Sequence, residues 1–391
     1  MSLLGMNIGV LGGGIGGLTA ALALAQRGAQ VTVLEQADAI SEVGAGIQVS
    51  PNGFCVLKAL GLAEEIRKTC LKAEAVELND YKAGRLVTRL DLGLLDDDQE
   101  YFFVHRADLI DILSKACRES GVEIRLLQKV ASVTPGEKPR ASMANGDTFT
   151  ADLIIGADGL HSITRQALNG TSAPFFTRQT AWRATVPNSM GHPNVAQVHM
   201  GPKRHLVSYP LRGGELVNLV AVQERMDWVE EGWSHRDDPD NLRAAFADFG
   251  GDVPALLREV TDVGLWGLFR HPVAQKWWGE NTAILGDAAH PTLPFMAQGA
   301  VMAMEDAWVL AESLAGTEAV TSGLALYQSK RHERCSRIVV QASGNAWKYH
   351  LSGLPMRMAA HTGMRLLGAL APKKMMGQFD WIYRFDVTGA D

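Results

Sequence analysis

Two side chains that can exchange protons, His205 and Tyr209, lie four residues apart in a segment predicted to be a strand. Side chains alternate between the two faces of a strand, so both residues point to the same face. At about 3.3 Å per residue their Cα atoms are roughly 13 Å apart. A single aromatic ring with a hydrogen bond at either side fits that gap. Surface positions or a satisfied pair in the core are the alternatives that the residues alone leave open.

A glycine run near the N-terminus suits the binding of a phosphate group. Gly12-Gly13-Gly14-Ile15-Gly16-Gly17 stands between a predicted strand (7–11) and a predicted helix (18–26). The first, third and sixth positions permit a tight turn, close approach of a pyrophosphate, and packing of the helix on the strand. The helix N-terminus then offers free N–H groups to the phosphates. The run predicts a dinucleotide site and does not separate FAD from NAD.

The next predicted strand (31–35) ends at an acidic residue, Glu35. A carboxylate at this point of a βαβ unit can accept hydrogen bonds from the ribose hydroxyls of a dinucleotide. The same charge would repel a 2′-phosphate.

Two later turns carry an aspartate directly after a predicted buried strand. The first is Gly156-Ala157-Asp158-Gly159, and the second is Gly286-Asp287-Ala288-Ala289-His290-Pro291. The second turn leads through Pro294 into a predicted helix over about 300–315, whose start points N–H donors at its neighbour. Such donors would stabilise an anionic group. We interpret His290 as a packed turn residue rather than a base.

The intervening sequence indicates how these residues are positioned. A helix is predicted over 108–120, and short alternating segments at 197–200, 205–210 and 216–223 predict an antiparallel sheet. The polar stretch 228–240 is predicted to be a surface loop, and the strand 282–285 returns to the first domain. The first domain is therefore expected to be discontinuous, with the sheet inserted into it.

Composition limits the classes of function. The chain has 391 residues, a net charge of −6 and 47% hydrophobic residues, and it shows no basic stripe for nucleic acid. No apolar run reaches the roughly 18 residues of a membrane span, and no signal peptide is recognised. The four cysteines form no C-x-x-C pair, so no metal site is expected. Reduced thiols and a cytoplasmic location are expected.

The three motifs, in this order and spacing, together with His105-Arg106-Ala107-Asp108-Leu109, resemble the single-component FAD-dependent aromatic hydroxylases. These enzymes share the para-hydroxybenzoate hydroxylase fold. The segments 201–215, 299–307 and 380–383 resemble 3-hydroxybenzoate 6-hydroxylase in particular. Salicylate and 6-hydroxynicotinate hydroxylases are close relatives.

The resemblance implies an α/β fold with an α+β insertion. A Rossmann-like FAD-binding domain would comprise residues 1–75, 101–175 and 272–330. An antiparallel-sheet substrate domain would comprise 76–100 and 176–271, and C-terminal helices would comprise 331–391. The Met-rich tail is expected to pack on the protein or to form a homodimer, and a membrane-facing amphipath is the alternative.

The resemblance also implies tight, non-covalent FAD, with NADH or NADPH as a transient co-substrate. Glu35 would bind the adenosine ribose, Arg106 would reach the flavin side, and Asp287 would hold the ribityl–pyrophosphate region. The full expected FAD-binding set is Gly12, Gly14, Ile15, Gly17, Glu35, Gln48, Arg106, Asp158, Asp287, Pro294, Gly299 and Ala300. Many relatives carry a basic residue where this chain has Gln36, which puts fine adenosine contacts in doubt.

The activity implied is hydroxylation of a small hydroxylated aromatic acid, similar to 3-hydroxybenzoate, by O₂ through a flavin hydroperoxide. The implied catalytic set is His205 as base or phenolate acceptor, Tyr209 as the group that orients the ring or its carboxylate, and Gln298 facing flavin and substrate. Arg183 is either a partner of the substrate carboxylate or an ordinary ion-pair residue. Three alternatives remain: decarboxylating hydroxylation of salicylate or 6-hydroxynicotinate, a flavin dehydrogenase or oxidase, and a non-catalytic flavoprotein that senses or binds.

Overall fold

The computed structural model describes residues 3–40, 46–225 and 236–389 of the chain. Most of the stretch 228–240 that the sequence predicts to be a loop lies outside these residues. Its described end forms the short strand β17 (Arg236–Asp237) and the start of helix α6 (Pro239–Ala245).

A six-stranded, mainly parallel sheet forms the first layer, in the order β19-β20-β12-β1-β2-β8. Strand β1 (Asn7–Leu11) pairs in parallel with β12 and with β2, and only β19 runs antiparallel. The other strands are β2 (Gln30–Leu34), β8 (Glu123–Arg125), β12 (Leu153–Gly156), β19 (Trp278–Gly279) and β20 (Thr282–Ile284). The central strands are apolar on both faces because other layers cover each face.

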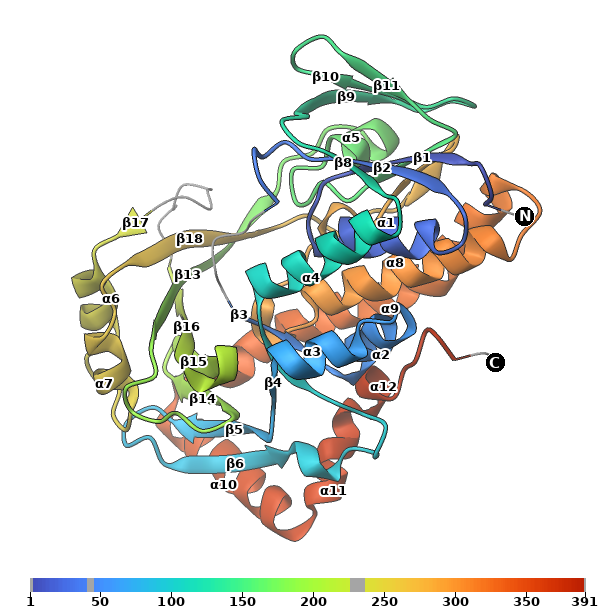
Figure 1. Cartoon of the computed structure of the whole chain (residues 1–391). Coiled ribbons are helices and arrows are strands. Elements are labelled where there is room, and N and C mark those ends of the chain that lie inside the picture. Colours follow the sequence, from blue (N-terminus) through green and yellow to red (C-terminus); the bar gives the residue numbers. More distant parts are fainter. Residues whose placement is uncertain (1–2, 41–45, 226–235, 390–391) are drawn as a thin grey trace.

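Helices cover one face of this sheet, and a small sheet covers the other (Figure 1). Helix α1 (Ile15–Ala25) packs against α4 (Arg106–Glu119) and α8 (Gly299–Ala315), and α8 packs on the long helix α9 (Val320–Tyr349). The small sheet is β11-β10-β9, with strands β9 (Val130–Thr134), β10 (Arg140–Met143) and β11 (Thr148–Thr150). Helix α5 (Ile163–Asn169) follows β12.

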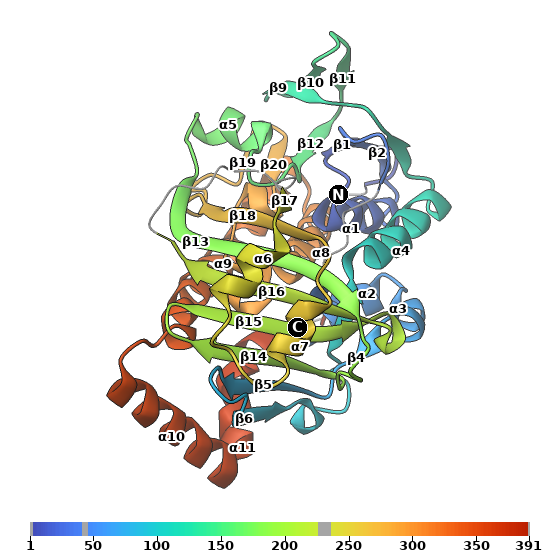
Figure 2. The ribbon, with the colours of Figure 1, turned by 90° about the vertical axis from the view of Figure 1, so that its left-hand side faces the viewer.

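An eight-stranded sheet in the order β17-β18-β13-β16-β15-β14-β5-β6 forms the second large layer (Figure 2). All neighbours pair antiparallel except β14 and β5. Its strands are β5 (Ala75–Asp80), β6 (Leu86–Asp91), β13 (Phe175–Pro187), β14 (Val195–Gly201), β15 (Arg204–Leu211), β16 (Leu216–Glu224), β17 and β18 (Val263–Arg270).

The two faces of this sheet have different neighbours. Helices α6 and α7 (Val253–Arg258) cover one face, where Trp182 and Phe246 pack in a buried cluster. The opposite face packs against Leu293 and Phe295, which precede α8, and against Tyr349 at the end of α9. The second face therefore looks toward the motif that follows β20.

A three-stranded sheet, β3-β7-β4, connects the two layers. It contains β3 (Gly46–Val49), β4 (Leu71–Lys72) and β7 (Phe102–His105), with helices α2 (Pro51–Ala59) and α3 (Ala63–Thr69) beside it. The chain ends in α10 (Leu354–Leu370), α11 (Pro372–Met376) and α12 (Asp380–Tyr383). In the described part of the chain no helix is long and apolar enough to cross a membrane.

The tail packs only in part. Met375 and Met376 of α11 are buried against the sheet, whereas Met358 and Leu370 of α10 are 61% and 81% exposed. The α/β class, with parallel and antiparallel sheets and C-terminal helices, agrees with the sequence analysis. The domain boundaries given there stay predictions.

Candidate active site

The glycine run forms the turn between β1 and α1, and the backbone geometry shows why glycine suits positions 12, 14 and 17. Gly12 has a φ of +104°, and a Cβ there would lie 2.5 Å from the carbonyl oxygen of Ala157. A Cβ at Gly17 would lie 2.0 Å from the carbonyl oxygen of Gly12. Gly14, the N-cap of α1, differs: no described atom lies within 4 Å of a Cβ built there. The turn therefore has no room for a side chain at Gly12 and Gly17, whereas the space beside Gly14 is open to an approaching pyrophosphate.

Glu35 lies beside this turn, just after β2. Its carboxylate accepts hydrogen bonds from the backbone N–H groups of Gly13 (2.6 Å) and Ala37 (2.8 Å). A carboxylate has about four lone-pair positions, so acceptor capacity remains for a ribose hydroxyl. The position and chemistry fit the expected role.

Asp158 is engaged by its own turn. Ser162 Oγ and Thr164 N and Oγ1 donate to its carboxylate over 2.5, 3.1 and 3.1 Å. Burial raises the pKa of this carboxyl. These bonds fix the start of α5, and a contact with the cofactor stays a prediction.

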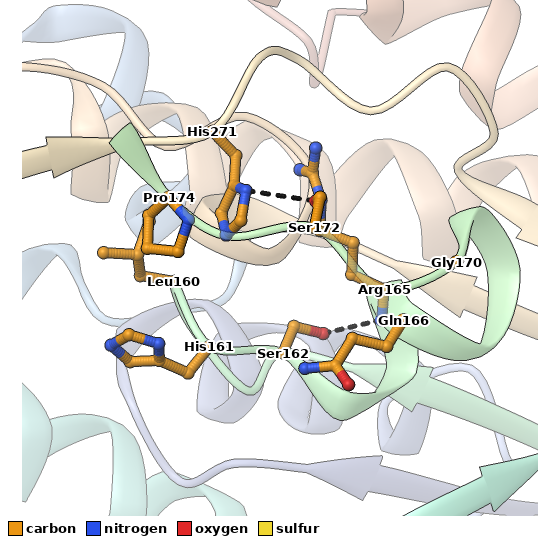
Figure 3. A pocket seen from close by; sticks show the side chains of 9 residues that line it. All are labelled: Leu160, His161, Ser162, Arg165, Gln166, Gly170, Ser172, Pro174 and His271. Carbon is orange, nitrogen blue, oxygen red and sulfur yellow. Dashed lines mark hydrogen bonds between the residues drawn. The ribbon is translucent and has the colours of Figure 1, made fainter. Parts of the chain in front are cut away.

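A small cavity lies next to this turn (Figure 3). Arg165, His161 and His271 line it, and Arg165 donates to the carbonyl oxygens of Ala288 (3.1 Å) and Pro272 (2.7 Å). Its volume of about 30 Å³ has room for a water molecule and not for a nicotinamide ring.

Arg106, Asp287 and Arg183 come from α4, from the turn after β20 and from β13, and they interact electrostatically. Burial and then repulsion from Arg183 lower the pKa of Arg106, Asp287 opposes both, and the net result is a pKa of about 10. Burial also raises the pKa of Asp287, although its side chain is exposed to solvent. A group that is both accessible and desolvated lies in a recess rather than on a convex surface.

Arg183 has no carboxylate partner among the residues that the structure describes. Its Nε is buried without a hydrogen bond, and its guanidinium lies 5.0 Å from the centre of the Trp266 ring. Burial lowers its pKa. The ion-pair interpretation of Arg183 therefore finds no support in the described residues, and a desolvated cation faces the same side of the sheet as Tyr209.

His205 and Tyr209 share that face of β15, with Val207 between them. The sheet register places Val207 opposite Val220 and Val220 opposite Arg183, so the arginine is two strands away at the same level. At about 4.8 Å between strands, its Cα is roughly 10 Å from that of Val207. A base, a phenol and a cation thus surround a patch of valines.

His205 is 2% exposed and packs against the rings of Phe295 and Tyr349, each with centres 5.3 Å away. Burial, and then the neighbouring His350, hold its pKa well below the usual range. Tyr209 is 3% exposed and stacks on Phe103 at 5.1 Å, and burial raises its pKa. His205 is therefore a neutral imidazole, which is the form that accepts a proton.

Gln298 is the N-cap of α8, but its amide is used inside the protein. Its Nε2 donates to Ser50 Oγ (2.9 Å), and its Oε1 accepts from Asn52 Nδ2 (3.1 Å). Asn52 in turn donates to the buried Glu305 (2.7 Å). These contacts hold the side chain at the start of α8, and its contact with flavin and substrate stays a prediction.

Gln48 lies on β3, which contacts α8. Gln48 accepts a hydrogen bond from Tyr101 Oη (2.7 Å). Pro294 begins a short 3-10 turn, and Gly299 and Ala300 form the first turn of α8, where N–H groups have no partner within the helix. The neighbouring residues Gly44 and Ala45 lie outside the described part of the chain.

A buried charged network supports α8. Arg331 pairs with Glu305 (2.6 Å) and Asp306 (2.8 Å), and all three side chains are fully buried. His290 pairs with Asp306, and although burial lowers the pKa of the histidine, Cys335 and Asp306 together raise it well above its usual value. His290, Asp306 and Cys335 could group around a metal ion, but Arg331 already neutralises the carboxylates, so we interpret them as structural. His290 is a packed residue, as the sequence analysis has it.

Comparison with known proteins identifies the family of this chain. The model of a family described as FAD binding domain matches residues 6–342. The chain is 32% identical over 395 residues to 3-amino-4-hydroxybenzoate 2-monooxygenase of Streptomyces platensis, covering 98% of this chain and 96% of that protein. It is 34% identical over 357 residues to 3-hydroxybenzoate 6-hydroxylase of Klebsiella oxytoca, covering 88% and 89%.

A solved salicylate hydroxylase substrate complex has the same fold, with a TM-score of 0.80 at 25% identity over 98% of this chain and 96% of that one. The fold of Klebsiella pneumoniae HpxO complexed with FAD and uric acid is also similar, with a TM-score of 0.83 at 24% identity over 95% and 96%. The chain therefore belongs to the FAD-binding family of these proteins, and it is an FAD-dependent aromatic-ring monooxygenase.

Proposed function

We propose that this enzyme hydroxylates a small aromatic acid that carries a ring hydroxyl, similar to 3-hydroxybenzoate, with O₂ and a reduced nicotinamide. The observation that carries the proposal is the face of the inserted sheet, where an apolar patch is surrounded by neutral His205, buried Tyr209 and Arg183, which has no carboxylate partner among the described residues. His205 suits a ring hydroxyl, Tyr209 suits the aromatic ring, and Arg183 suits a carboxylate. The names of the relatives from Streptomyces and Klebsiella support the same substrate class.

The cofactor-binding residues in this proposal are those whose position fits a dinucleotide. Gly12, Gly14, Ile15, Gly17 and Glu35 would hold the adenosine and pyrophosphate. Gln48, Arg106, Asp158, Asp287, Pro294, Gly299 and Ala300 would lie along the remaining length of FAD. When bound, FAD supplies the redox chemistry and the activation of O₂. The chain itself binds, orients and shields the reactants.

His205 acts as the base in this scheme. A phenol that loses its proton to His205 Nε2 becomes an electron-rich phenolate, which favours attack on the ring by an electrophilic oxygen. Tyr209 Oη would orient the ring, and the Arg183 guanidinium would pair with the carboxylate. Gln298, held by Ser50 and Asn52, would position the start of α8.

Water must be kept away from the reacting groups, because it diverts activated oxygen to peroxide. The apolar side chains Val207, Val220 and Phe295 line the face where the substrate would lie. A homodimer and a cytoplasmic location, where reduced nicotinamide is available, complete the proposal. The four cysteines, none of which forms a disulfide, are consistent with a reducing compartment.

The test follows NADH and NADPH oxidation and oxygen uptake with 3-hydroxybenzoate, salicylate and 6-hydroxynicotinate. Nicotinamide oxidation that depends on the acid and yields a hydroxylated ring supports the proposal. Flavin reduction by the acid alone would instead indicate a dehydrogenase or oxidase. His205→Ala and Tyr209→Phe should retain FAD and lose hydroxylation, and normal turnover by both variants would show that this site is wrong.

A further inference from the structure

A chain of three titratable side chains leads from the buried base to the surface. His205 Nδ1 lies 2.7 Å from Nε2 of His350, and His350 Nδ1 lies 2.9 Å from Oε1 of Glu224. The side chain of His350 is 2% exposed, whereas that of Glu224 is 41% exposed. The line therefore begins in the protein interior and ends at solvent.

Backbone contacts hold the three members in place. Lys203 N–H donates to the carbonyl oxygen of His350 (3.2 Å), and the carbonyl oxygen of Lys203 accepts from Glu224 N–H (2.9 Å). Strand β15, the end of β16 and the residue after α9 are thus tied together at one point. Rotation of either imidazole would also disturb ring packing, since the two ring centres are 4.9 Å apart.

The hydrogen bonds determine which nitrogen of each ring carries the proton. Burial lowers the pKa of both His205 and His350, so each has one N–H and one lone pair at neutral pH. Glu224 can only accept, so His350 Nδ1 is the donor in that bond. His350 Nε2 is then an acceptor, and His205 Nδ1 must donate to it. The lone pair of His205 is left on Nε2, where no described residue forms a hydrogen bond.

We propose that His350 and Glu224 are positioning residues that form a proton exit path for the base, an inference that rests on the proposed function of His205. The substrate O–H bond breaks, and His205 Nε2 takes the proton. His205 Nδ1 passes its proton to His350 Nε2, and His350 Nδ1 passes its proton to Glu224 Oε1, which releases it to water. No electrons are transferred, and both imidazoles end neutral as the other tautomer.

The surroundings of the path contain few competing groups. Tyr349 packs against His205, and burial raises its pKa to about 12, so it stays protonated. Phe295 and Met200, which face His205 from the turn before α8 and from β14, are apolar. Two other buried histidines lie outside the path: His361 on α10 pairs with Asp80 across 3.6 Å, and His199 on β14 is opposite Leu206, whose side chain points to the other face of β15.

The first experiment reads the tautomers of the FAD-loaded enzyme without substrate. With ¹⁵N-labelled histidine, NMR at pH 7 should show His205 and His350 both neutral and protonated on Nδ1, with His205→Gln and His350→Gln giving the assignments. A proton on Nε2 of either residue, or an imidazolium at either, would overturn the path.

The second experiment measures phenol ionisation in the oxidised holoenzyme, using 3-hydroxybenzoate as the probe and ultraviolet absorbance after a pH jump. Glu224→Gln and His350→Gln keep hydrogen-bonding groups but cannot relay a proton. We expect the ionisation rate to fall about tenfold or more in each, with the Kd changed less than about twofold. His361→Gln is the matched control and should behave as wild type.

Unchanged ionisation rates and pH profiles in both relay variants would contradict the path. If no aromatic acid is turned over while the tautomers are as expected, the substrate proposal fails and only the hydrogen-bonded chain from His205 to Glu224 stands, without a phenol as its proton donor. Normal turnover with the opposite tautomers would overturn the path alone.

Discussion

Replacing Arg183 by methionine tests whether this arginine binds the carboxylate of the substrate. The side chain is desolvated, contacts the Trp266 ring and has no described carboxylate partner. Methionine keeps most of the apolar contact and removes the charge. The proposal then predicts a loss of ligand affinity without a loss of protein stability.

The expected size follows from the kind of bond. A hydrogen bond to a charged group contributes about 1.5–3 kcal/mol, which corresponds to a roughly 10- to 150-fold weaker Kd for an aromatic acid. The carboxamide of the same acid has no charge to pair and should lose less than about threefold. Removing an unpaired buried cation leaves no partner behind, so the free energy of unfolding should stay equal or rise.

Titration of the flavin absorbance with 3-hydroxybenzoate and 3-hydroxybenzamide, together with urea unfolding, measures all three quantities. Arg212→Met is the matched control, because Arg212 lies in the turn between β15 and β16, pairs with Asp108 and is 45% exposed. Equal losses for acid and amide would refute carboxylate binding. A fall in unfolding free energy of about 2 kcal/mol or more would show that Arg183 has a structural partner instead.

Three further predictions concern the cofactor and the core. Gly17→Val should yield a colourless protein that FAD does not reconstitute, because its side chain would collide with the carbonyl oxygen of Gly12; a yellow variant would contradict the predicted turn. Arg331→Met should lower the unfolding free energy by about 3–5 kcal/mol by leaving Glu305 and Asp306 buried without this cation, and a loss below about 1 kcal/mol in urea would contradict the network. Burial lowers the pKa of His199 to about 4, below its usual 6.5, so the unfolded chain binds more protons between these values and stability falls as pH falls through them. Urea titrations at pH 6.5 and pH 4 should show that the unfolding free energy of the wild-type protein falls by roughly 3 kcal/mol and that of His199→Leu does not. Equal losses in both proteins would contradict this prediction.

The sequence predicts the parts of this site that local rules determine. Gly12, Gly14 and Gly17 each meet a steric requirement of the turn between β1 and α1, so their spacing alone predicts that turn. His205 and Tyr209 share a face because strand side chains alternate, and the sheet register agrees. The family, the fold class and the FAD-dependent monooxygenase activity expected from these motifs are confirmed by the comparisons.

Contacts between distant segments are what the sequence does not show. His350 meets His205 from 145 residues away, at the end of a helix without a recognisable motif. The hydrogen bonds of the Gln298 amide with Ser50 and Asn52, about 250 residues earlier in the chain, are also not visible in the sequence, and the expected role of Gln298 beside flavin and substrate stays a prediction. One signal was available for the charged network: Glu305 and Asp306 interrupt an otherwise apolar helix, which indicates buried cationic partners.

The most direct test of the central claim is the fate of the oxygen atoms. The enzyme is supplied with ¹⁸O₂, reduced nicotinamide and a hydroxylated aromatic acid, and the product is analysed by mass spectrometry. The proposed function predicts one ¹⁸O atom in each hydroxylated ring for each nicotinamide oxidised. A product whose new oxygen comes from water, or an acid oxidised without any incorporation, would contradict it.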